Sequence, residues 1–172
     1  MLQGLTRRER EITDLEQITK ILEKENIIHI GLVDGDEPYV VPMNYGFTME
    51  DGKLTLYLHG ATEGKKLDLM RANPKVFFSI ESDITAFSGS VACQYGTSYS
   101  SIMGKGTAEI LENPEDKMKG LSIFMKSQTG LDFQFNERMV SAVAVIRIDV
   151  KEYTAKHRPL PIQNQKQMEM NK

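Results

Sequence analysis

The segment that runs from His59 to Lys66 has the composition of an anion-binding site. It combines two glycines, a threonine hydroxyl, a histidine and two lysines where a strand pattern gives way to a helix pattern. Unpaired N–H groups at a helix N-terminus attract phosphate, glycine permits close approach, and lysine neutralises charge. The spacing is not that of a Walker loop. The segment therefore predicts a phosphate site, and the alternative is a capped helix with a solvated lysine pair.

A second candidate is the segment 99–106, in which Ser100 and Ser101 precede an apolar strand. Hydroxyl groups at the start of a strand can donate to phosphate oxygens. Serine side chains at strand entrances also commonly satisfy backbone groups. The two serines are therefore candidate ligand contacts, with local backbone satisfaction as the alternative.

A third candidate is the segment 41–45, in which Pro42 interrupts a good strand pattern. Proline removes one ladder hydrogen bond, which implies an edge strand or a bulge and frees neighbouring backbone groups. Asn44 offers a donor and an acceptor to the polar edge of a heterocycle. The alternative is an edge-strand proline beside an ordinary polar residue.

Other chemistries find little support in the sequence. His29, His59 and His157 lie far apart, so no metal site is expected. A Ser-His-Asp or Cys-His hydrolase is disfavoured, because no Gly-x-Ser-x-Gly elbow is present and Cys93 lacks an activating motif. No Gly-x-Gly-x-x-Gly joins a strand to a helix, which disfavours a Rossmann dinucleotide site.

The elements that must position these residues follow from hydrophobic periodicity and turn signals. A hairpin turn at 34–37 and a second turn at 50–52 separate the first three strands, and a long loop is expected from Ser82 to Thr97. Asp14 and Thr62 are the expected N-caps of the first two helices. Helices are expected over 14–25, 63–72 and 113–128, and strands over 27–33, 39–47, 53–59, 76–80, 99–111 and 140–150.

Strands outnumber helices about two to one in this pattern, and short turns join the first three. Both features favour an antiparallel meander that closes into a small barrel with flanking helices. The turns are too short for the crossovers of a doubly wound parallel sheet. We expect one domain over residues 1–158 and a flexible tail over 159–172.

Composition limits the partners and the compartment. The 172 residues carry a formal charge of -3, are 40% hydrophobic and include one cysteine. A slightly acidic chain gives no reason to expect nucleic acid or anionic lipid, and no segment has the length and apolarity of a membrane span. A single cysteine suits a reducing compartment, so a cytoplasmic protein is expected.

The three candidate segments occur in the order and spacing of a known family. The chain resembles the pyridoxamine 5'-phosphate oxidase-like split-barrel flavoproteins, and most closely the branch of nitroimidazole-resistance (Nim-type) reductases. The resemblance covers roughly residues 5 to 158. It is carried by Arg7-Arg8-x-Arg10-Glu11-Ile12, Val41-Pro42-Met43-Asn44-Tyr45, His59-Gly60-Ala61 with Gly64-Lys65-Lys66, the stretch from Cys93 to Ser101-Ile102 with Gly104-Lys105-Gly106, and Tyr153-Thr154-Ala155-Lys156.

The resemblance implies a mainly β protein with flanking helices, a six-stranded antiparallel split barrel of the FMN-binding type. It also implies a homodimer with FMN at the subunit interface. His59, Lys65 and Lys66 would hold the FMN phosphate, with hydroxyl contacts from Ser101 and Ser100. The isoalloxazine edge would be lined by Val41, Pro42, Met43, Asn44 and Tyr45. His59 is also the candidate for a role in the chemistry.

The function that the resemblance implies is an FMN-dependent oxidoreductase. Electrons would enter from a reduced nicotinamide or another small donor and leave to a small acceptor, such as a nitro or quinone compound. True pyridoxamine phosphate oxidases end in an arginine-rich motif that this chain lacks after Arg158, so vitamin B6 oxidation is not expected. The alternatives are a non-catalytic flavin- or haem-binding or sensor protein and a protein that uses a deazaflavin.

Overall fold

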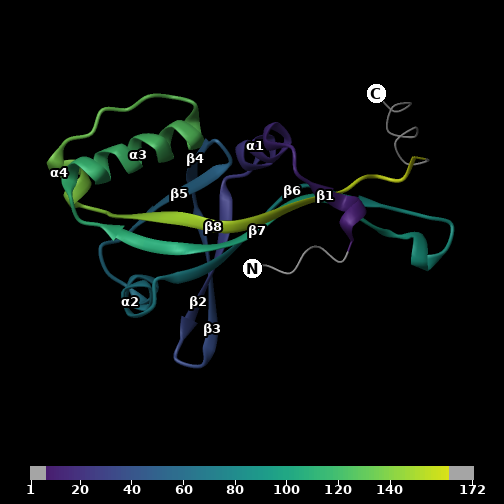
Figure 1. Ribbon diagram of the computed structural model, residues 1–172, viewed down its shortest axis with the longest axis horizontal. Coiled ribbons are helices and arrows are strands. Elements are labelled where there is room, and N and C mark those ends of the chain that lie inside the picture. The colour runs from purple at the N-terminus through teal and green to yellow at the C-terminus, as the bar shows by residue number, and fades with distance from the viewer. Residues whose placement is uncertain (1–6, 163–172) are drawn as a thin grey trace.

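The computed structural model describes residues 7–162, which fold around one antiparallel sheet of eight strands (Figure 1). The strand order is β3-β2-β6-β7-β8-β5-β4, and β1 pairs separately with β8. The strands are β1 (Glu11–Ile12), β2 (Ile27–Asp34), β3 (Glu37–Asn44), β4 (Gly46–Glu50), β5 (Lys53–Gly60), β6 (Lys75–Phe87), β7 (Gly96–Leu111) and β8 (Ala144–Arg158). The helices are α1 (Leu15–Lys24), α2 (Lys65–Ala72), α3 (Pro114–Thr129) and α4 (Glu137–Ser141), with 3-10 turns η1 (Arg8–Arg10) and η2 (Ala92–Gln94).

The sheet closes on itself between β3 and β4, which stand at opposite ends of the strand order although Tyr45 alone separates them in the chain. This arrangement makes the structure a split barrel, as expected. Two more strands are present than the six expected, because β1 was missed and the expected strand 39–47 divides at Tyr45 into β3 and β4. β3 pairs only with β2 within the described residues, so Pro42 lies on an edge strand as its missing N–H requires.

Alternating apolar residues fill the interior of the barrel. On β5, Leu54, Leu56 and Leu58 are fully buried, and they belong to the same cluster as inward residues of β2, β6 and β8. α1 adds one apolar face to this cluster. The N-cap of α1 is Asp14, as predicted, because its carboxylate accepts a hydrogen bond from the Gln17 N–H.

α3 packs on the outer side of the barrel, over β4, β5 and β8 (Figure 1). Two glycines permit this close approach. A Cβ atom on Gly46 would lie 2.4 Å from the Cα of Phe124, and one on Gly120 would lie 3.0 Å from a methyl group of Val145. Val145 and Leu121 therefore belong to a second, smaller cluster on the face of β8 opposite the barrel core.

Three expectations about the second half of the chain were wrong. Much of the expected loop 82–97 is strand, since β6 and β7 continue as a two-stranded arm in which Phe87 pairs with Gly96 (Figure 1). A register shift between Ser82 and Thr85 lets the pairing resume beyond the irregular residues. The last strand begins at Ala144 instead of Val140, because α4 precedes it, and it extends to Arg158.

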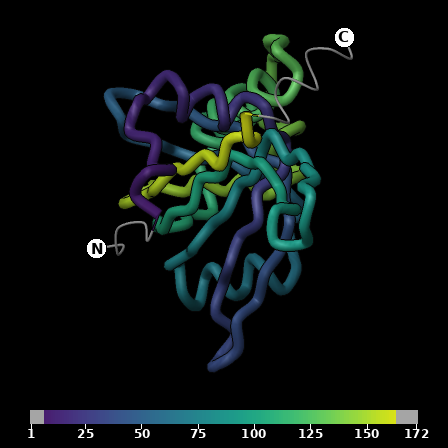
Figure 2. The backbone as a smooth tube through the Cα atoms, turned by 90° about the vertical axis from the view of Figure 1, so that its right-hand side faces the viewer, coloured from purple at the N-terminus to yellow at the C-terminus, as the bar shows by residue number. Residues whose placement is uncertain are grey.

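The backbone trace shows the β2–β3 hairpin projecting beyond the rest of the sheet (Figure 2). No helix among residues 7–162 is long and apolar enough to span a lipid bilayer. The predicted tail falls largely outside the described residues, which end at Ile162.

Candidate functional site

The predicted anion site coincides with the start of α2. The helix begins at Lys65, and its N-cap is Gly64 instead of the expected Thr62. Gly64 has a φ of 132°, a conformation that L side chains rarely adopt, and no side chain caps the helix. The Leu67 and Asp68 N–H groups donate to the Gly64 carbonyl, and no side chain caps the Lys65 and Lys66 N–H groups at the start of α2. Uncapped N–H groups at a helix start can bind a phosphate.

The side chain of Lys66 lies beside the end of β5 and the edge strand β3. A Cβ atom on Gly60 would lie 3.2 Å from the Cε and 3.4 Å from the Nζ of Lys66, and 4.0 Å from the Cε of Met43. Because Gly60 has no side chain, the Lys66 side chain can occupy this space. The space beside Gly60 therefore brings side chains of α2 and β3 to the end of β5, so Lys66 and Met43, both candidate site residues, lie in the same region of the barrel.

Lys65 points toward the β2–β3 hairpin. Its Nζ lies 2.5 Å from a carboxylate oxygen of Asp34 and 5.1 Å from the centre of the Tyr39 ring. The hydrogen bond and charge of Asp34 raise the pKa of Lys65, which keeps its positive charge. Asp34 and Tyr39 were not predicted as site residues, because the sequence signal at 34–37 indicated only a turn.

His59 lies on the outer face of β5, where it packs against α3. Its ring centroid is 4.5 Å from that of Phe124, with the rings tilted by 57°. The residue is exposed overall, but partial desolvation of its ring lowers the pKa of His59. The neutral imidazole is therefore favoured near neutral pH, so His59 is suited to hydrogen bonding more than to neutralising a phosphate.

This pKa direction predicts a pH effect on stability. Because folding lowers the pKa of His59 below its unfolded value of about 6.5, its favourable contribution is present above that pH and is lost as the pH falls toward the folded pKa. We expect the free energy of unfolding to fall less between about pH 7.5 and about pH 5.5 in His59→Phe than in the wild type. Urea denaturation at both pH values measures this difference, and equal losses in the two proteins would contradict it. His29 and His157 are present in both proteins, so their contributions to the pH dependence cancel in the comparison.

The β3 candidates differ in their accessibility. Val41 is half-buried, Pro42 is exposed and Met43 is buried. Asn44 is exposed, but its side-chain amide donates a hydrogen bond of 3.1 Å to the Asn26 carbonyl. The carbonyl oxygen of the Asn44 side chain is left for a ligand.

Tyr45 lies in the barrel core. Its side chain is 1% exposed, and its hydroxyl donates a hydrogen bond of 2.8 Å to the Leu22 carbonyl at the end of α1. Burial raises the pKa of Tyr45. The phenol is thus a core group whose hydrogen bond connects α1 to the segment between β3 and β4. The expectation that Tyr45 lines the isoalloxazine edge is therefore wrong, because its ring is buried.

Removing this hydroxyl tests the structural role of Tyr45. We expect Tyr45→Phe to lower the free energy of unfolding by about 1–2 kcal/mol, because the buried hydrogen bond to Leu22 is lost. Urea denaturation measures this loss. A Tyr45→Phe protein as stable as the wild type would contradict the structural role of the hydroxyl.

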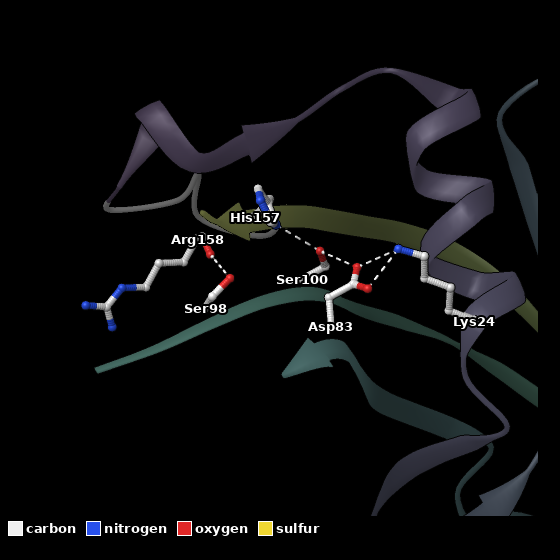
Figure 3. Close-up of polar contacts among 6 residues, drawn as sticks. All are labelled: Lys24, Asp83, Ser98, Ser100, His157 and Arg158. Atoms are coloured by element: carbon white, nitrogen blue, oxygen red, sulfur yellow. Dashed lines mark hydrogen bonds and ion pairs between the residues drawn. The ribbon is translucent and has the colours of Figure 1, made fainter. Parts of the chain in front are cut away.

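Ser100 is committed to a network inside the protein (Figure 3). Its hydroxyl lies 3.0 Å from the Nδ1 of His157 and 3.4 Å from a carboxylate oxygen of Asp83. Lys24 of α1 lies 2.8 Å from both oxygens of that carboxylate. The residue types match a hydrolase triad, but the serine stands between the acid and the histidine, so the carboxylate cannot orient the imidazole. Ser100 is therefore not a free phosphate ligand.

Ser101 faces the opposite side of the sheet. It is 4% exposed, and its hydroxyl oxygen has no hydrogen-bond partner among the described residues. β7 is separated from the edge strand β3 by β2 and β6, a path of about 14 Å around the sheet at about 4.8 Å per strand. The fold of the single chain consequently does not bring Ser101 together with Met43 and the nearby Lys66.

The outer face of β2, β3, β6 and β7 carries exposed apolar side chains. Val40 is 62% exposed, and Phe77 and Met103 are 38% and 39% exposed. Across the sheet, Val40 and Phe77 both pair with Gly31, so their side chains share one face. We call the face that includes Val40, Phe77 and Met103 the outer apolar face; Ser101 lies on the same side of β7 as Met103.

A family model described as pyridoxamine 5'-phosphate oxidase matches residues 14–157. The chain belongs to the pyridoxamine 5'-phosphate oxidase-like family. No curated protein sequence matches it. Among solved structures, a candidate 5-nitroimidazole antibiotic resistance protein from Bacteroides thetaiotaomicron is 30% identical, with a TM-score of 0.73 and coverage of 86% of each chain.

Two solved structures of lower sequence identity share the fold of this chain. A flavocytochrome from Azotobacter vinelandii is 18% identical with a TM-score of 0.74, covering 92% of this chain and 74% of its own. An FAD and haem binding protein from Mycobacterium smegmatis is 15% identical with a TM-score of 0.74, covering 92% of this chain and 80% of its own. At these identities the likeness establishes the split-barrel fold.

The residues at the split fit a phosphorylated flavin. The uncapped start of α2, the glycines at 60 and 64, and the Lys66 ammonium supply donors and positive charge at one point. The unpartnered Ser101 hydroxyl is a further donor on the outer face. These features match the donor set that a phosphate and a polar ring edge require.

Proposed function

We propose that this family member is an FMN-binding oxidoreductase that passes electrons from a reduced nicotinamide or another small donor to a small acceptor, in the manner of a nitroimidazole reductase. The observation that carries the proposal is the uncapped N-terminus of α2 with Lys66 at the split of the barrel. Similarity to a 5-nitroimidazole resistance protein at 30% identity supports it. We further propose a cytoplasmic location.

In this proposal the protein binds and orients the cofactor. The α2 N–H groups and Lys66 would hold the FMN phosphate, and Lys65 would join them by leaving Asp34. Val41, Pro42, Met43 and the free side-chain oxygen of Asn44 would line the isoalloxazine edge. Bound FMN would supply the electron-transfer chemistry, so the chain itself need not provide an acid or a base. His59 precedes Gly60 in β5, and its neutral ring packs on Phe124 of α3. This contact would hold the end of β5 in place beside the phosphate.

We propose that the active form is a homodimer, with FMN held between the protomers. The outer apolar face offers a surface that a second copy would cover, and a monomer would leave Val40, Phe77 and Met103 in water. A second copy would also bring a Ser101 hydroxyl toward the flavin that the first protomer cannot reach with its own.

Turnover by the FMN-reconstituted protein tests the oxidoreductase assignment. We expect oxidation of NADH or NADPH that depends on an added 5-nitroimidazole or quinone, measured from the loss of nicotinamide absorbance. Omission of FMN should abolish the reaction. A protein that binds FMN tightly but transfers no electrons from any donor would favour the non-catalytic flavin-binding alternative.

A further inference from the structure

A groove at the far end of the β6–β7 arm is separate from the residues proposed to bind the flavin. It has a volume of 680 Å³, within the usual range for small-molecule sites. η1, the segment 87–94 and the end of β8 form its walls. The lining includes two arginines, Arg10 and Arg158, and one acidic residue, Glu9. Apolar surface comes from Phe87, Leu160 and Pro161.

Arg158 is held in place by uncharged contacts. Its guanidinium carbon lies 5.1 Å from the centre of the Phe87 ring, and it is half-buried. A Cβ atom on Gly96 would lie 2.8 Å from one guanidinium nitrogen, so the absence of a side chain at this position makes room for the arginine. Figure 3 shows the side chain directed away from the Asp83–Ser100–His157 network.

The guanidinium of Arg158 has no counter-ion within the described part of the chain. No carboxylate of residues 7–162 forms an ion pair with it, whereas Glu9 is within 4.0 Å of Arg10 and within 3.7 Å of Arg7. A partly desolvated charge is costly unless it is paired. A fixed guanidinium fork is well suited to two parallel hydrogen bonds from a carboxylate or phosphate.

We propose that this groove binds a small organic anion, a carboxylate or a phosphate monoester. The anionic group pairs with Arg158, and Arg10 adds positive charge at the rim. The apolar part of the ligand lies against Leu160 and Pro161. The groove shares no lining residue with the start of α2, so this binding is independent of the flavin.

Cys93 provides a local reporter, because it is exposed, lines the groove and is the only cysteine in the chain. The experiment measures the rate of Cys93 alkylation by uncharged iodoacetamide in the full chain, with phenyl phosphate or benzoate as the probe ligand. We expect saturable protection of about fivefold or more by at least one of the two anions, because a ligand in the groove covers the thiol. Benzyl alcohol, which lacks the charge, should protect little.

Variants of the groove decide the outcome. Arg158→Gln should lower the affinity for the protecting anion by roughly 10-fold to 100-fold, since a charge-assisted pair is lost. Gly96→Ala should also lower this affinity, because the new Cβ displaces the guanidinium. Arg158→Lys should retain part of the affinity. Arg7→Gln, outside the groove, is the matched control. Circular dichroism and FMN content confirm that each variant is folded.

The proposal would be overturned by absence of protection in the wild type at millimolar anion, or by equal protection in wild type and Arg158→Gln. Protection that is lost in Lys66→Gln but kept in Arg158→Gln would also overturn it, since the anion would then act from the flavin phosphate site. Protection by phosphate esters alone or by carboxylates alone would support the groove and identify which anion it prefers.

Discussion

Replacement of both Lys65 and Lys66 by glutamine lowers the affinity for FMN by about 100-fold or more, because two charge-assisted contacts to the phosphate are lost at once. The free energy of unfolding changes little, since Lys65 is exposed and exposed ion pairs contribute little to folding. FMN fluorescence titration and urea denaturation measure the two effects on the same preparation.

The matched control for this pair lies on α3. Lys117→Gln with Lys119→Gln removes the same charge from the first half of a helix on the other side of the barrel, and FMN affinity should stay within about threefold of the wild type. The single variant Lys66→Gln should account for most of the loss, because Lys65 is already paired with Asp34. Unfolding of the double variant without a loss of FMN affinity would contradict the site.

Gly46→Ala lowers the free energy of unfolding by about 3 kcal/mol or more, because the added methyl group meets backbone atoms that cannot rotate away. Its Cβ would lie 2.4 Å from the Cα of Phe124 and 3.0 Å from the Ile123 carbonyl oxygen. α3 must therefore move away from the barrel. Urea denaturation measures the loss, and failure of the variant to accumulate as folded protein agrees with it.

Gly31→Ala is the control for this substitution. Gly31 also lies within a strand, but its nearest non-neighbouring atom would be 3.4 Å from the new Cβ, an ordinary contact. Its stability should remain within about 1 kcal/mol of the wild type. A Gly46→Ala protein as stable as Gly31→Ala would show that α3 does not pack on β4 as described.

Local patterns in the sequence predicted the elements whose causes are local. The apolar spacing of α1 and its cap at Asp14 follow from nearby residues, and α3 (Pro114–Thr129) matches the helix expected over 113–128 to within one residue at each end. The edge position of Pro42 also followed, because the missing N–H depends on one residue alone. The start of α2 was predicted to within two residues for the same reason.

The errors arose where distant residues decide the outcome. Tyr45 is a core residue because its hydroxyl reaches the Leu22 carbonyl, and Ser100 is occupied because Asp83 and His157 converge on it. The strand beyond Ser82 forms because it pairs with residues near Gly96, although the segment 82–97 as a whole consists mostly of small and polar residues. The family resemblance named these residues as ligands, but it could not indicate which hydroxyls the fold had already engaged.

The visible absorption spectrum of the purified protein, with acid release and chromatography of any chromophore, tests flavin binding most directly. We expect flavin absorption and released FMN, or uptake of one added FMN per protomer into a dimer measured by light scattering. A Soret band would favour the haem-binding alternative. A colourless monomer that takes up no FMN would show that the protein is not an FMN-binding oxidoreductase.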